Sequence, residues 1–165
     1  MKYERFEQLP VWQAAIDLAV AVYALTEKEP FRHRYSLRDQ LERATVSIAN
    51  NVAEGFERGT KQELLTFLYI ARGSAGEVRS MLCMLGKILA FAELEVAIST
   101  LKSGAESISK QLGAWVRTLR DSELKGERYV DQRARRADGA RRDRDEFLKE
   151  LEQQRGAGWG KGTAG

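Results

Sequence analysis

Residues 47–56 place polar side chains beside an apolar stripe at helical spacing. Ser47, Asn51 and Glu54 follow one another at intervals of four and three residues, so they share one side of a helix. A buried polar group without a partner costs about 1–3 kcal/mol. The sequence therefore predicts that these side chains bind a neighbouring helix, each other or a ligand.

A short connection predicts which segment faces this one. Thr60 and Glu63 form a capping box that begins a new helix soon after the first one ends. So short a link makes the two helices antiparallel neighbours. Residues 47–54 are then expected to face residues 64–74.

The favoured interpretation is an internal hydrogen-bond network between these two helices, and contact with a ligand or partner is the alternative. Its expected members are Asn50 or Asn51, Ser74, Arg72 and Glu54. The residues assigned to the whole structural motif are Ser47, Asn51, Glu54, Gly55, Gly73, Ser74 and Glu77.

Two glycines lie close together in the middle of the helix that begins after Thr60. Each mid-helix glycine costs about 0.5–1 kcal/mol relative to alanine. Gly73 and Gly76 therefore indicate that another helix or a ligand approaches the backbone at this point.

Residue types that carry most enzymatic chemistry are scarce in this chain. His33 and Cys83 each occur alone, which rules out an intrachain disulfide and argues against a zinc site. Glu54 and Glu77 could form a carboxylate pair, but the Glu-x-x-His pairs of di-metal bundles are missing. We therefore expect no enzyme, no catalytic residue, no metal and no cofactor, and a hydrolase at the two glutamates is a distant alternative.

Eight basic side chains are candidates for contacts with the phosphates of a nucleic acid. The net charge is +3, from 27 Lys and Arg against 24 Asp and Glu, which is a mild indication of an anionic partner. Acidic neighbours in the sequence make a solvated face of mixed charge at least as good an interpretation. The candidates are Arg32, Arg34, Arg38, Arg43, Arg58, Lys61, Arg72 and Arg79.

Hydrophobic periodicity predicts an all-α protein. Apolar residues recur at threes and fours through four segments, without an alternating strand pattern. Short links favour an antiparallel up-down-up-down four-helix bundle in residues 1–120. Residues 121–165 are expected to form a charged, Gly-rich tail that is disordered or partly helical. The expected helices are Pro10–Lys28, a helix from the N-cap Ser36 to Arg58, Lys61–Phe91 and Glu93–Arg120.

The first predicted helix is apolar on most of its surface. One stripe contains Val11, Leu18 and Val22, and an adjacent stripe contains Trp12 and Tyr23. A helix of this kind is buried on more than one side, which in so small a chain indicates self-association.

No segment has the length of a membrane span. The longest uncharged stretches are about half of the ~20 apolar residues that a spanning helix needs. The first residues also lack the apolar run of a signal peptide. We expect a cytoplasmic protein without membrane contact.

Four motifs follow one another within residues 5–120, and as an ordered set they resemble the bacterial four-helix bundle proteins. These are also called 23S rRNA intervening-sequence proteins. The motifs are Phe6-Glu-x-Leu9-x-Val-Trp12-Gln-x-Ala, Tyr35-Ser-Leu-x-x-Gln40-Leu-x-Arg43-Ala, Ser47-Ile-x-x-Asn51-x-Ala-Glu54-Gly55 and Phe67-Leu-x-Ile-Ala71-x-Gly73-Ser74-x-x-Glu77.

The resemblance implies an antiparallel four-helix bundle that is often a homopentamer. It also implies kinship with the accessory variability determinant of diversity-generating retroelements, a basic pentamer that binds nucleic acid and a reverse transcriptase. The leading hypothesis is therefore a non-enzymatic oligomeric bundle that binds RNA or DNA through basic surface residues. The alternative is a protein-interaction or assembly module that uses the first helix and binds no nucleic acid.

Overall fold

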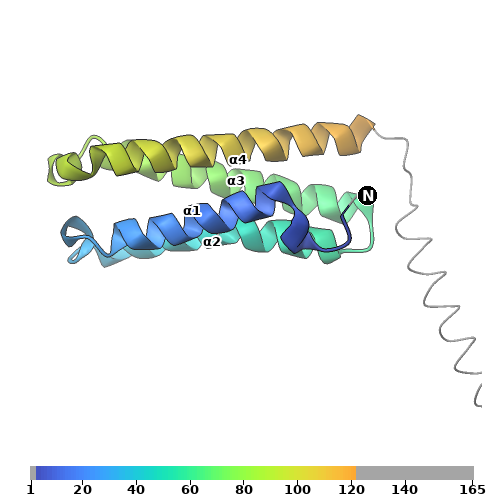
Figure 1. The fold of residues 1–165 in the computed structure, drawn as a ribbon, viewed down its shortest axis with the longest axis horizontal. Helices are drawn as coiled ribbons and strands as arrows, with labels where there is room; N and C mark the ends of the chain where they lie inside the picture. The colour runs from blue at the N-terminus through green and yellow to red at the C-terminus, as the bar shows by residue number, and fades with distance from the viewer. Residues whose placement is uncertain (1–2, 122–165) are drawn as a thin grey trace, which may run out of the picture. The chain divides into compact units, whose positions relative to one another are not determined.

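The computed structural model describes residues 3–121, and the regular elements in this part of the chain are helices (Figure 1). This confirms the predicted all-α class, whereas the predicted tail lies outside the described residues. The long helices are α1 (Pro10–Thr26), α2 (Tyr35–Glu57), α3 (Lys61–Leu85) and α4 (Glu95–Asp121). Three short 3-10 helices are η1 (Phe6–Gln8), η2 (Glu29–Phe31) and η3 (Leu89–Leu94).

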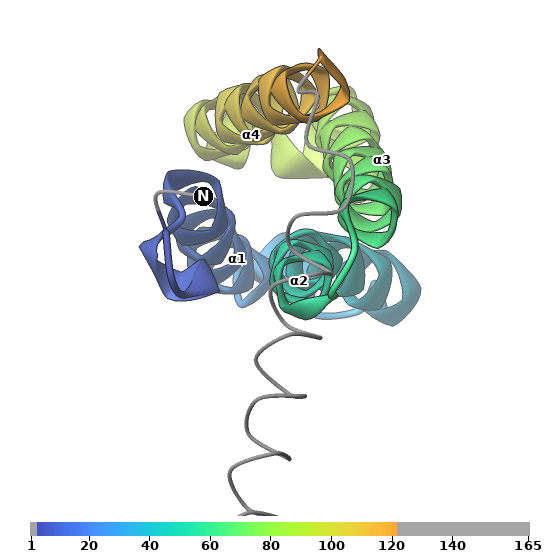
Figure 2. The same cartoon turned by 90° about the vertical axis from the view of Figure 1, so that its right-hand side faces the viewer.

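The four long helices form an antiparallel bundle in which each helix packs against two neighbours. α2 contacts α1 and α3, while α4 contacts α3 and α1. Viewed along the bundle, the helices follow one another in chain order around a common core (Figure 2). The predicted up-down-up-down topology is therefore confirmed.

Apolar side chains at helical spacing fill the centre of the bundle. Leu41, Leu68, Leu82 and Leu112 come from three different helices, and each is fully buried. Their spacing puts one face of each helix toward the core, and burying a leucine contributes about 1.5–3 kcal/mol. Within residues 3–121, no helix is both long and apolar enough to cross a membrane.

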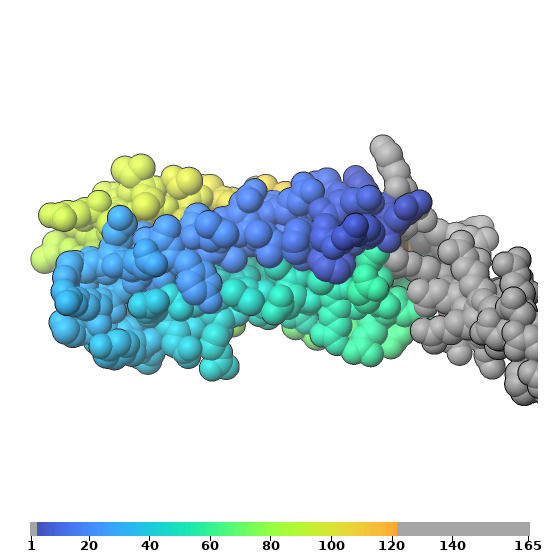
Figure 3. All heavy atoms as spheres, turned by 60° about the horizontal axis from the view of Figure 1, so that its bottom comes forward, coloured from blue at the N-terminus to red at the C-terminus, as the bar shows by residue number. Residues whose placement is uncertain are grey.

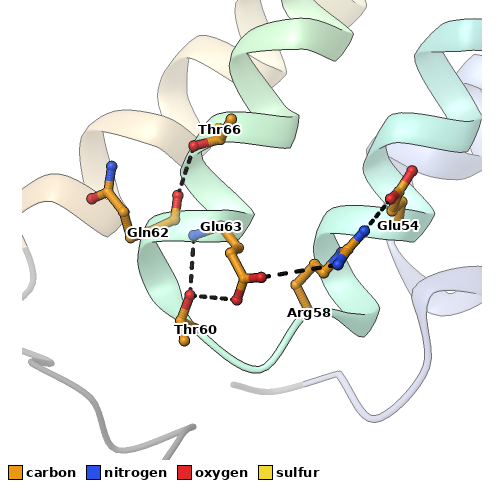
Figure 4. Close-up of polar contacts among 6 residues, drawn as sticks. All are labelled: Glu54, Arg58, Thr60, Gln62, Glu63 and Thr66. Carbon is orange, nitrogen blue, oxygen red and sulfur yellow. Dashed lines mark hydrogen bonds and ion pairs between the residues drawn. The ribbon is translucent and has the colours of Figure 1, made fainter.

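The turn between α2 and α3 has the predicted capping box. Thr60 is the N-cap of α3, and its hydroxyl oxygen accepts a hydrogen bond from the backbone N–H of Glu63 at 3.2 Å. The same hydroxyl donates to the Glu63 carboxylate at 2.7 Å, so the two side chains hold the start of the helix together (Figure 4).

Two predicted helix boundaries at the other end of the bundle are wrong. α2 begins at Tyr35 with Arg34 as N-cap, so Ser36 lies inside the helix. α3 ends at Leu85 and does not reach Phe91. The physical reason is tertiary: Phe91 is 1% exposed and packs edge-on against Phe31, with 4.8 Å between ring centroids. A helix that continued straight through this segment would carry Phe91 past the end of the core.

The glycine of α2 is closely packed, whereas the two glycines of α3 face open space. A Cβ added to Gly55 would lie 2.7 Å from Cβ of Phe67, so α2 and α3 approach closely here. A Cβ added to Gly73 or Gly76 would meet nothing within 4 Å. The prediction that another helix approaches Gly73 and Gly76 is therefore wrong within the described chain, and the alternative, a ligand, stays a prediction.

Gly55→Ala tests the close approach of α2 and α3. The added methyl group forces the two helices apart, so we expect the free energy of unfolding to fall by about 1–3 kcal/mol. The matched control is Gly76→Ala, which should stabilise the chain by about 0.5–1 kcal/mol because its Cβ has room. Urea unfolding followed by circular dichroism measures both, and equal stability of the two variants would contradict this packing.

Candidate nucleic-acid interface

Polar side chains of the predicted motif connect α2 to α3. The hydroxyl groups of Ser47 and Ser74 lie 2.9 Å apart and share a hydrogen bond between the helices. The Asn51 amide donates to the backbone carbonyl of Ser47 at 2.7 Å and to its hydroxyl at 3.0 Å. All three side chains are partly buried, so this contact satisfies polar groups that face the neighbouring helix. Residues 47–54 do face residues 64–74, as the sequence predicts.

Two other predicted members of this network, Glu54 and Arg72, lie elsewhere. Glu54 is exposed and pairs with Arg58, the residue that caps the C-terminus of α2. Arg58 also reaches within 4.0 Å of Glu63, so it joins the two sides of the α2–α3 turn (Figure 4). Asn50 is exposed, and Arg72 lies on the side of α3 that faces α4. The prediction of Asn50 or Asn51 and of Ser74 is therefore confirmed through Asn51 and Ser74, whereas the prediction that Arg72 and Glu54 belong to this contact is wrong.

The two glutamates considered as a carboxylate pair are far apart. Glu77 accepts a hydrogen bond from Gln40 at 3.1 Å, near the start of α2. Glu54 lies near the end of the same helix, fourteen residues further along, which at 1.5 Å per residue is about 20 Å. Within residues 3–121, no group of three or more His, Cys, Asp or Glu side chains is placed to hold a metal ion.

The eight predicted basic residues do not form one surface. Arg32 and Arg34 lie at the end of the bundle where α2 begins, whereas Arg58 and Lys61 lie at the turn where it ends. Arg38 and Arg43 lie between them on α2, and Arg72 and Arg79 lie on α3.

Most of the basic residues on α2 and its flanking turns already have a partner. Arg38 donates to Glu42 at 2.8 Å, and Arg43 lies 3.5 Å from Asp39. Arg32 donates to Glu29 at 2.7 Å. The Arg34 guanidinium donates to the backbone carbonyl of Pro30. These residues form a face of mixed charge, which is the alternative to a nucleic-acid-binding surface that the sequence offered.

Arg72 and Arg79 belong instead to a basic cluster between α3 and α4, which we call the α3–α4 seam. Its members are Arg72, Arg79, Lys102, Lys110 and Arg117. The first indication is the environment of Glu106. Lys110 donates to its carboxylate at 2.7 Å. This hydrogen bond holds the pKa of Glu106 below its ordinary value, and the charges of Lys110, Arg79 and Lys102 act in the same direction.

The second indication is the surface of Gly113. A Cβ added to this glycine would lie 3.5 Å from Cζ of Arg72 and 3.7 Å from Nη1 of Arg117. Both guanidinium groups therefore lie over the same bare stretch of α4. Within residues 3–121, neither Arg72 nor Arg117 forms an ion pair. Two neighbouring cations without a carboxylate are an open site for an anion.

The α4 members of the seam, Lys102, Lys110 and Arg117, are not among the site residues that the sequence predicted. The signal was present, because residues equidistant from the turn between α3 and α4 meet in an antiparallel pair. With the turn near residue 92, Arg72 faces the region of Gly113 and Arg79 the region of Glu106. A cluster that two helices share does not stand out in the pattern of either helix alone.

A groove between α2 and α3 is a poorer place for an anion. Its volume is about 580 Å³, and it has two carboxylates but a single cation, Arg43, which lies beside one of those carboxylates. Like charges repel a phosphate here, so the groove does not match the chemistry of the seam. Its lining residues are Ser36, Asp39, Gln40, Arg43, Ala44, Ser47, Ser74 and Glu77.

The fold defines the class of the protein as an antiparallel four-helix bundle with a polar contact between its second and third helices. Residues 7–114 match the family model of the 23S rRNA-intervening sequence protein, so the chain belongs to this family. The resemblance seen in the sequence motifs is thereby confirmed. No curated protein matches the chain. Kinship with the accessory variability determinant stays a prediction.

The carboxyl pKa of Glu106 reports the positive potential of the seam. Lys110→Gln should raise this pKa toward its ordinary value, and Arg79→Gln should raise it by a smaller amount. Because the pKa of Glu106 is lower in the folded state than in the unfolded state, its ionised carboxylate stabilises the fold at neutral pH. This stabilisation is lost as the pH falls through the folded-state pKa of Glu106.

Carbon-13 NMR of the Glu106 carboxyl group measures this titration directly. The control variant is Lys87→Gln, which removes an exposed cation next to the end of α3 and should leave the Glu106 pKa unchanged. If Glu106 has the same pKa in Lys110→Gln as in the unsubstituted protein, the cations of the seam do not act on Glu106 as described.

Proposed function

We propose that this chain is a cytoplasmic, non-enzymatic nucleic-acid-binding protein that works as a homo-oligomer. The α3–α4 seam would contact the phosphate backbone of RNA or DNA. The observation that supports the proposal is the row of five cations along the seam: Arg79, Lys102 and Lys110 act on the carboxylate of Glu106, and Arg72 and Arg117 lie over Gly113, seven residues further along α4. Lys and Arg side chains supply the sequence-independent part of nucleic-acid affinity.

The charge balance of the seam supports this more than the net charge of the chain does. The whole chain has a net charge of +3, but the seam has five cations against one carboxylate. Arg72 and Arg117 are exposed, and no carboxylate within residues 3–121 neutralises them. A phosphate would therefore meet cations that need not first leave another partner.

Self-association would strengthen binding by a small cluster of this size. Two or more linked copies convert later contacts into intramolecular ones, which raises the overall affinity without any new type of contact. The surface that supports self-association is the outer side of α1. Val20 and Tyr23 are 65% and 43% exposed there. Figure 3 shows this face, where α1 and α2 lie side by side.

The part of the α1 surface next to α2 is also hollowed. A groove of about 370 Å³ lies between Tyr23 of α1 and a stretch of α2 that includes Val46 and Asn50. Exposed apolar side chains beside a groove offer area that a second copy could bury. The proposed oligomer would use this face and leave the α3–α4 seam, on another side of the bundle, accessible.

The competing function is a protein-assembly module without nucleic-acid binding. The exposed apolar residues of α1 favour this second function. A module of this kind, however, would have no need for the cluster of cations in the α3–α4 seam. Partners such as a reverse transcriptase belong to this second possibility as well as to the first. The two functions differ in one respect that is easily measured, the dependence of RNA or DNA binding on salt.

Replacing Arg72 and Arg117 together by Gln should weaken nucleic-acid binding at low salt by roughly tenfold or more. Loss of two phosphate contacts should also reduce the slope of log affinity against log salt by about 1.4–1.8. The matched control is Arg32→Gln with Arg43→Gln, which removes the same charge from residues that have acidic partners. Fluorescence anisotropy with labelled RNA and DNA measures both.

Absence of affinity for RNA and DNA at 50 mM salt would contradict nucleic-acid binding altogether. Equal losses in the two double variants would show instead that the effect comes from overall charge and not from the seam.

Val20→Glu tests the α1 surface as the site of self-association. Burying a new charge at an interface is unfavourable, so the variant should dissociate to a smaller species at micromolar concentration. Leu89→Glu is the matched control, because Leu89 is 90% exposed but lies at the end of the bundle. Sedimentation velocity gives the mass of each species. A strictly monomeric unsubstituted chain, or an unchanged mass for Val20→Glu, would contradict the assignment.

A further inference from the structure

An exposed aromatic side chain lies beside the cations of the α3–α4 seam. Tyr69 is 46% exposed and precedes Arg72 by three residues on α3. Side chains at this spacing are neighbours on a helix surface. Arg72 in turn lies over Gly113 next to Arg117. A tyrosine ring and two guanidinium groups that form no ion pair within residues 3–121 thus lie within one small region.

Two positions that follow Tyr69 on the same face of α3 carry no side chain. The next turn of α3 contains Gly73 and Gly76, and a Cβ added to either would meet nothing within 4 Å. Because helical side chains lean toward the N-terminus of their helix, the missing side chain of Gly73 leaves space next to Tyr69 on its C-terminal side. A flat group of the size of a nucleobase has room to lie against the ring.

Two other tyrosines are exposed within residues 3–121, and neither accompanies these cations. Tyr23 lines the groove between α1 and α2, and Tyr35 is the first residue of α2. The pairing of an exposed ring with unpaired cations is therefore specific to this part of α3.

We propose that the α3–α4 seam selects single-stranded nucleic acid, with an unpaired base stacked on Tyr69 and the adjoining phosphates on Arg72 and Arg117. This inference rests on the proposed function, because it specifies which nucleic acid the seam binds. Bases within a duplex are stacked on each other, so only an unpaired base presents its face to a protein side chain. Stacking combined with a positively charged groove is the usual way to bind single strands without sequence preference.

The charge of the seam alone would not make this distinction. Cations on a surface attract duplex and single-stranded phosphates alike. Tyr69 adds a contact that a duplex cannot make, so selectivity should depend on the ring while overall affinity depends on the arginines.

The test uses the full chain and four oligonucleotides of the same sequence: single-stranded RNA, single-stranded DNA and the two duplexes. Tyr69→Ala should weaken binding of at least one single strand by roughly tenfold, and it should leave duplex binding unchanged. Tyr69→Phe keeps an aromatic ring and should bind like the unsubstituted chain. Tyr35→Ala is the control for loss of an exposed tyrosine elsewhere. Circular dichroism checks that each variant is folded.

The outcomes separate this inference from the proposed function. If Tyr69→Ala binds every oligonucleotide as the unsubstituted chain does, or loses single strands and duplexes equally, the stacking proposal is wrong. Nucleic-acid binding itself then still stands as long as Arg72→Gln with Arg117→Gln weakens it. A Tyr69 effect on RNA but not on DNA would assign the contact to the 2′-hydroxyl-bearing strand, and equal effects would assign it to the bases that both share.

Discussion

The close contact between α2 and α3 is the constraint on which the rest of the bundle depends. Gly55 has no room for a Cβ because Phe67 lies against its backbone, so the two helices meet at one fixed position near their turn. Along the same contact, Ser47 and Ser74 can share a hydrogen bond only if the register stays fixed. Ser47, Asn51 and Glu54, which the sequence placed beside an apolar stripe, thus have partners within the fold.

This constraint also decides where charge stays available. The side of α3 that faces α2 carries the serine contact and Glu77, and the arginines of α2 have acidic neighbours along their own helix. The other side of α3 faces α4, which places Lys102, Lys110 and Arg117 beside Arg72 and Arg79. A bundle of mixed composition can in this way carry a local excess of positive charge, which net charge does not reveal.

Most of the fold could be predicted from the sequence because its signals are local. Helical periodicity, the Thr60–Glu63 capping box and the short α2–α3 link needed no knowledge of distant residues. The end of α3 could not be predicted in this way, since it depends on Phe91 packing against Phe31, sixty residues earlier. Gly73 and Gly76 show the same limit, because helix propensity records the cost of a glycine and not whether a neighbour is present. The seam was predictable in principle, but only by pairing α3 with α4 across their turn.

Lysine footprinting shows whether nucleic acid binds along the α3–α4 seam. The full chain is acylated with and without an excess of single-stranded RNA, and the modified lysines are quantified by mass spectrometry. RNA is expected to protect Lys102 and Lys110, whereas Lys28, which follows the end of α1, reacts as before. Unchanged reactivity of Lys102 and Lys110 under conditions in which RNA is bound would contradict binding along the seam.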